Sequence, residues 1–77
     1  MPHVIVKMYA GRSEEQKARL TEQIVKDVTS VLKCEEQWVS VAIEDVEPED
    51  WPEQVYKPEI LPNWDKLYKK PGYNPLK

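Results

Sequence analysis

The chain has 77 residues, of which 40% are hydrophobic and 32% are charged, a composition typical of one small globular domain. Its formal net charge of −3 argues against nucleic acid as a partner, and no apolar run approaches the roughly 20 residues that span a membrane. One cysteine and one histidine exclude an internal disulfide and a His/Cys metal cluster, so we expect a cytoplasmic protein without either.

The first part of the chain has the pattern of a β-α-β unit. Alternating apolar residues predict a strand over residues 3–9. A capping-box pattern at 13–16 then opens a helix over residues 14–32, in which apolar residues recur at three- and four-residue spacing. A second strand is expected over residues 38–46. Because the helix must cross back over the sheet, this α/β (α+β) fold has parallel strands.

The remainder of the chain is rich in proline and aromatic residues, and it holds every proline except Pro2. We expect a short helical turn at 48–51, a second helix over residues 59–70 and a tail over residues 73–77. In that second helix, proline is tolerated only near the start, where backbone N–H groups lack helical partners anyway.

The whole chain, residues 1–77, is expected to form one domain, with a β-α-β core over 2–46 and a C-terminal helical extension over 47–77. A core of this size rarely supplies more than a few kcal/mol of stability without a disulfide, a metal or a second copy. Two strands also make an incomplete sheet, because small sheets need more strands to be stable. Two such units would form one four-stranded sheet, so we expect a homodimer.

The chemically unusual residue is Pro2, which directly follows the initiator methionine. Aminopeptidases generally remove a methionine that precedes proline, and removal would leave Pro2 with a free secondary amine. An α-amino group titrates near about 8, and an apolar pocket or a nearby cation lowers its pKa. Such an amine would be a usable general base near neutral pH.

Three segments carry further information: PHVIV at 2–6, GRSEEQK at 11–17 and WVSVAI at 38–43. Together they resemble the 4-oxalocrotonate tautomerase family, whose members begin with proline after methionine removal and have a β-α-β core. The resemblance covers about the first 46 residues. Trp51, the lengthened C-terminal region and KKPGY at 69–73 resemble the short dimeric subgroup with enol and phenylpyruvate tautomerase activity.

The resemblance implies an isomerase that needs no cofactor, in which Pro2 moves a proton between an enol hydroxyl and a carbon atom. Arg12 falls on the family's carboxylate-binding arginine, whose guanidinium offers a planar fork to a carboxylate. Ser40 stands where the family carries a second arginine, which favours a monocarboxylate substrate such as a phenylpyruvate-like 2-oxo acid. Trp51 falls where the family places an aromatic pocket wall.

Two other functions stay open at this point. One is hydration or dehalogenation of an unsaturated acid on the same fold, for which Glu44 or Asp45 would have to activate water. The other is a non-enzymatic module that binds a small ligand or a peptide through the acidic, aromatic and proline-rich C-terminal half.

Overall fold

The computed structural model describes residues Met1–Lys77, which divide into two compact units, Met1–Asp45 and Val46–Lys77. In chain order, the elements are β1 (His3–Tyr9), α1 (Glu14–Leu32), a 3₁₀ turn (Glu36–Trp38), β2 (Ser40–Val46), a second 3₁₀ turn (Pro48–Asp50), a π-helix (Pro52–Ile60) and a third 3₁₀ turn (Trp64–Lys66). None of these helices combines the length and the apolar character required to traverse a bilayer.

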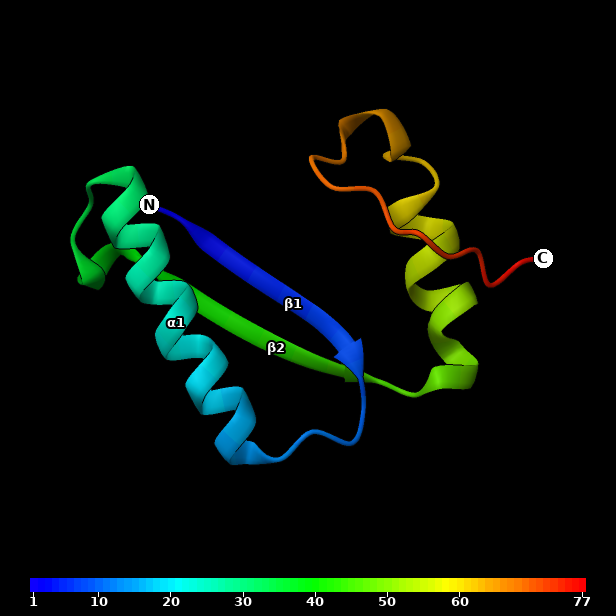
Figure 1. The fold of residues 1–77 in the computed structure, drawn as a ribbon, viewed down its shortest axis with the longest axis horizontal. Coiled ribbons are helices and arrows are strands. Elements are labelled where there is room, and N and C mark those ends of the chain that lie inside the picture. Colours follow the sequence, from blue (N-terminus) through cyan, green and yellow to red (C-terminus); the bar gives the residue numbers. More distant parts are fainter. The chain divides into compact units, whose positions relative to one another are not determined.

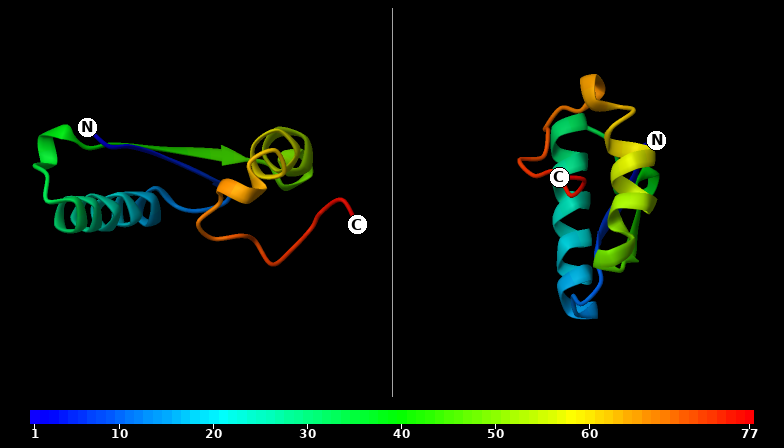
Figure 2. Two further views of the ribbon diagram at one scale, coloured as in Figure 1. Left: turned by 90° about the horizontal axis from the view of Figure 1, so that it is seen from above. Right: turned by 90° about the vertical axis from the view of Figure 1, so that its right-hand side faces the viewer.

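The N-terminal unit is a β-α-β arrangement with parallel strands, as the sequence predicts. β1 and β2 pair in one two-stranded sheet, and their arrows point the same way in Figure 1. α1 forms a separate layer along one face of the two strands (Figure 2). Val41 and Ile43 of β2 line the same hollow as Ala18 and Thr21 of α1, so this face of the strand is turned towards the helix.

Local capping signals explain where α1 begins and ends. The Ser13 hydroxyl accepts a hydrogen bond from the Gln16 N–H at 3.1 Å, and the Gln16 side chain accepts one from the Ser13 N–H at 3.0 Å. This reciprocal pair satisfies two backbone groups that would otherwise lack partners. At the other end, Lys33 adopts a left-handed conformation with φ of 56° and stops the helix. The predicted helix is confirmed at both ends.

The second strand begins later than the sequence predicts. Trp38 belongs to the 3₁₀ turn Glu36–Trp38. Its N–H donates to the Glu35 carbonyl, and the Val39 N–H donates to the Glu36 carbonyl. Neither N–H is therefore free to pair with the neighbouring strand. Pairing starts at Ser40, whose N–H donates to the Pro2 carbonyl at 3.1 Å.

The predicted helix over residues 59–70 is wrong. The observed helix is Pro52–Ile60, and it has π character, since the Leu61 N–H donates to the Tyr56 carbonyl five residues earlier at 2.9 Å. Pro58 lies inside this helix rather than near its start. Proline lacks an N–H and crowds the preceding turn of an α-helix, and the wider π turn accommodates it here.

The C-terminal unit has a small aromatic core. All three buried side chains of the chain, those of Val46, Val55 and Tyr56, belong to this unit. The Tyr73 ring lies 5.7 Å from the Tyr56 ring, and the Tyr73 hydroxyl accepts a hydrogen bond from Trp51 Nε1 at 2.8 Å. The predicted tail over residues 73–77 contains no helix or strand, but its first residue, Tyr73, packs against this core.

Candidate active site

Pro2 lies immediately before β1 and is half-buried. Its carbonyl accepts a hydrogen bond from the Ser40 N–H at 3.1 Å, so the chain is paired with β2 from this residue onward. In the structure Met1 precedes Pro2, and the Pro2 nitrogen is then a tertiary amide without useful basicity. Only removal of Met1 gives this nitrogen the character of an amine.

His3 and Ser40 form a second link at the same end of the sheet. His3 Nδ1 and Ser40 Oγ lie 2.6 Å apart, which is a short hydrogen bond between residues 37 positions apart in the chain. The link lies on the face of the sheet away from α1, because Ser40 alternates with Val41, which is turned towards the helix. Sequence reasoning missed His3, because nothing local marks a histidine whose partner comes from another strand.

Arg12 lies at the opposite end of β1. It is exposed and sits between Gly11, with φ of 122°, and Ser13, the residue that caps α1. The seven residues of β1 separate it from Pro2, which corresponds to about 23 Å at about 3.3 Å per residue. This is much longer than a small 2-oxo acid, so one protomer does not bring Pro2 and Arg12 to the same substrate.

The two carboxylates considered for water activation are both paired with lysines. Glu44 lies 3.7 Å from Lys7 Nζ, and Asp45 accepts a hydrogen bond from Lys17 Nζ at 2.5 Å. The Asp45 contact raises the pKa of Lys17 above its ordinary value of 10.5. It also ties the first turn of α1 to the end of β2, close to the segment that carries Arg12. A carboxylate held in such a pair is a poor candidate for a general base.

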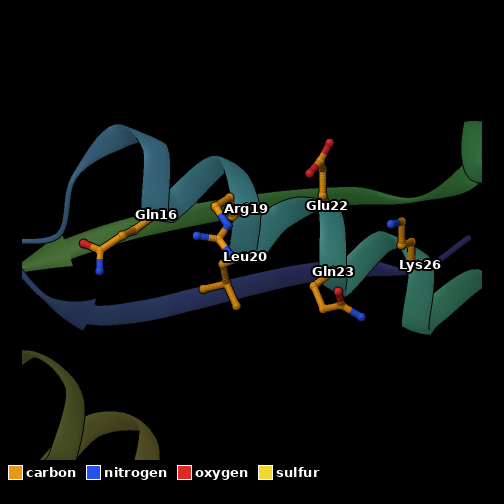
Figure 3. A pocket seen from close by; sticks show the side chains of 6 residues that line it. All are labelled: Gln16, Arg19, Leu20, Glu22, Gln23 and Lys26. Carbon is orange, nitrogen blue, oxygen red and sulfur yellow. The ribbon is translucent and has the colours of Figure 1, made fainter.

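One hollow of the N-terminal unit lies on α1 and not at Pro2. It has a volume of about 430 Å³ and is lined by Gln16, Arg19, Leu20, Glu22, Gln23 and Lys26 (Figure 3). All six side chains come from one exposed helix, and none of the predicted site residues is among them. The hollow therefore supplies no reacting group for the predicted chemistry.

Trp51 belongs to the C-terminal unit and is half-buried there. Its Nε1–H donates to the Tyr73 hydroxyl, and this bond restrains the orientation of the indole ring. A restrained aromatic ring can serve as a wall for an apolar ligand group. Its role in the site stays a prediction.

Comparison with known proteins identifies the class to which this fold and these residues belong. The family described as "Tautomerase enzyme" matches residues 2–55. A protein of Xylella fastidiosa named "Probable tautomerase" is 43% identical over 76 residues, which cover 99% of this chain and 93% of that protein. "Tautomerase PptA" of Cronobacter sakazakii is 38% identical over 95% of this chain and 97% of its own length.

A third relative, "Tautomerase PptA" of an Enterobacter species, is 40% identical over 96% of this chain and 99% of its own length. The chain therefore belongs to the tautomerase family. At the level of that family it is an enzyme, an isomerase of the tautomerase kind. The resemblance read from the sequence is confirmed.

Proposed function

We propose that the protein is a keto–enol tautomerase that needs no cofactor and acts on a small 2-oxo acid with one carboxylate. After removal of Met1, the secondary amine of Pro2 takes a proton from the enol hydroxyl and returns one to the neighbouring carbon atom. The reaction moves a proton and rearranges one double bond, so it requires neither an oxidant nor a bound metal. The arginine at position 12 binds the substrate carboxylate.

The observation that carries this proposal is the position of Pro2. The family match begins at this residue. The Pro2 carbonyl accepts a hydrogen bond from the Ser40 N–H, which joins Pro2 to the paired strands β1 and β2. The nitrogen then lies at the rim of a sheet, where a substrate can reach it. General acid–base catalysis needs a base held within reach of the proton that it takes.

The separation of Pro2 and Arg12 supports a site shared between two protomers. The single chain leaves the N-terminal unit without a fully buried side chain, and Ile5 and Tyr9 of β1 are about half exposed, at 52% and 49%. In a two-fold dimer, two copies of the same strand that pair edge to edge are antiparallel. The N-terminal end of β1 then faces the C-terminal end of the partner strand, so Pro2 of one protomer meets the partner's Arg12.

Residue 40 supports the choice of a monocarboxylate. Ser40 carries no charge, and its hydroxyl already bonds to His3. A second carboxylate on the substrate would find no cation at this position. Burial of an unpaired carboxylate is costly, so substrates with an apolar or aromatic body are preferred.

The test of the proposal begins with the intact mass of the protein isolated from cells, which is expected to lack Met1. The same sample is then assayed for ketonisation of the enol of phenylpyruvate. We expect turnover that scales with enzyme concentration and persists after treatment with a chelator. A folded protein that starts at Pro2 and has no effect on the ketonisation rate would contradict the proposed function.

A further inference from the structure

Ser40 forms hydrogen bonds with Pro2 and His3, the two residues that would begin the chain after removal of Met1. Its N–H donates to the Pro2 carbonyl at 3.1 Å, and its hydroxyl lies 2.6 Å from His3 Nδ1. Pro2 and His3 contact the same residue of β2 through different groups, one on the backbone and one on a side chain. The His3–Ser40 pair therefore fixes the register of β1 against β2 at the end of the sheet next to Pro2.

The first residues of a chain fray readily unless specific contacts hold them in place. With Met1 removed, no covalent neighbour precedes Pro2, and only its carbonyl side connects it to the sheet. A proton-transfer base tolerates little misplacement, since an error of about 1 Å can cost about a hundredfold in rate. Contacts that stop the end of β1 from fraying therefore have a direct effect on a base at position 2.

We infer that the His3–Ser40 pair positions Pro2 for catalysis. This inference rests on the proposed function, because the position of Pro2 affects turnover only if Pro2 is the base. His3 and Ser40 are then positioning residues that act through Pro2. The inference assigns a role to His3 and gives Ser40 a different role from the substrate contact that the sequence implies.

The two roles of Ser40 predict different kinetics. If the Ser40 hydroxyl contacted the substrate, its loss would weaken substrate binding and raise KM, and changes at His3 would have little effect. If the His3–Ser40 pair positions Pro2, loss of either side chain lowers kcat and leaves KM nearly unchanged. Loss of both side chains is then no worse than loss of one, because each single change already removes the same bond.

The experiment compares His3→Leu with His3→Asn, two side chains of the same shape. Asn places a hydrogen-bonding atom at the same number of bonds from the backbone as His Nδ1, whereas Leu places a methyl group there. Ser40→Ala and the double variant Ser40→Ala/His3→Leu complete the cycle. Glu44→Gln is the matched control, because it breaks the Lys7–Glu44 ion pair between the same two strands, away from Pro2.

Two quantities are measured for every variant, namely hydrogen exchange of the backbone amide at position 40 and the kcat and KM of ketonisation. We expect His3→Leu, Ser40→Ala and the double variant to exchange about two- to tenfold faster, with kcat lower by a similar factor. His3→Asn and Glu44→Gln are expected to match the wild type in both quantities.

The exchange measurement tests, independently of any activity, whether the His3–Ser40 pair holds the end of the chain. Unchanged exchange at position 40 in His3→Leu would overturn it, and so would a raised KM in Ser40→Ala with His3→Leu unaffected. If the wild-type protein, verified to start at Pro2, has no tautomerase activity, the proposed function fails. Faster exchange in His3→Leu, with His3→Asn like the wild type, would still establish that the pair holds the chain end.

Discussion

Two variants, one with little activity and one with none, are expected to regain activity when their protomers are mixed. In the first variant, Arg12→Ala, the amine of Pro2 is intact but the carboxylate-binding group is lost. In the second, one extra residue before Pro2 converts the amine to an amide while Arg12 is retained. If each site takes Pro2 from one protomer and Arg12 from its partner, a mixed dimer contains one intact site and one site that lacks both groups.

The expected recovery follows from the geometry of the N-terminal unit. The length of β1, about 23 Å, keeps Pro2 and Arg12 of one protomer apart, so an intact site needs both protomers. Random exchange of equal amounts makes about half of the dimers mixed, with one intact site of two, so activity should reach about 25% of wild type. Arg12→Ala alone should retain roughly 1–10%, because hydrogen bonds to charged groups contribute about 1.5–3 kcal/mol.

The assay is ketonisation of the phenylpyruvate enol, measured before and after mild denaturation and refolding of the mixture to exchange protomers. Each variant taken through the same treatment alone is the control, and sedimentation checks that all samples are dimers. Recovery to about a quarter of wild type supports a shared site. Activity no higher than the average of the two separate variants would refute the reasoning from strand length.

Three further predictions concern single residues. Ser40→Arg should raise the kcat/KM of a dicarboxylate relative to a monocarboxylate by roughly ten- to a hundredfold, and no change in that ratio would contradict the role given to position 40. Asp45 raises the pKa of Lys17 above 10.5, so the free energy of unfolding in urea should be higher for the wild type than for Lys17→Met. This difference should be complete below pH 10.5 and decline above it. A difference that grows with pH would contradict the pairing of Lys17 with Asp45. In the wild type, kcat/KM should rise with pH with a midpoint below about 8, and Pro2→Ala, which keeps a primary amine, should lower activity substantially without abolishing it.

The parts of the fold that the sequence predicts well are those with local signals. The alternation of its apolar residues predicts the observed β1, and the capping box of Ser13 and Gln16 predicts the observed start of α1. The C-terminal unit lacks such signals. Its π-helix contains Pro58, and Trp51 is restrained by Tyr73, which lies 22 residues later in the chain. Propensity and periodicity do not reveal contacts of that kind.

The candidate site shows the same limit. The family resemblance names Pro2 and Arg12 together, but only strand geometry shows that one protomer holds them at opposite ends of β1. His3 has no distinguishing context in the sequence. It gains one when strand pairing brings Ser40 within hydrogen-bond distance. Sequence patterns therefore suggested which residues matter, and the fold shows which of them can act together.

The central claim is that the base is the free amine of Pro2, and one comparison tests it most directly. The protein that starts at Pro2 is assayed beside a variant with one extra residue before Pro2, and a control variant carries the same extra residue at the C-terminus. Intact mass establishes each N-terminus, and sedimentation establishes that each sample is a folded dimer. The account predicts full ketonisation activity in the wild type and the control, and none above background in the variant extended before Pro2. Full activity in that extended variant would contradict the account, because an amide nitrogen cannot accept the proton.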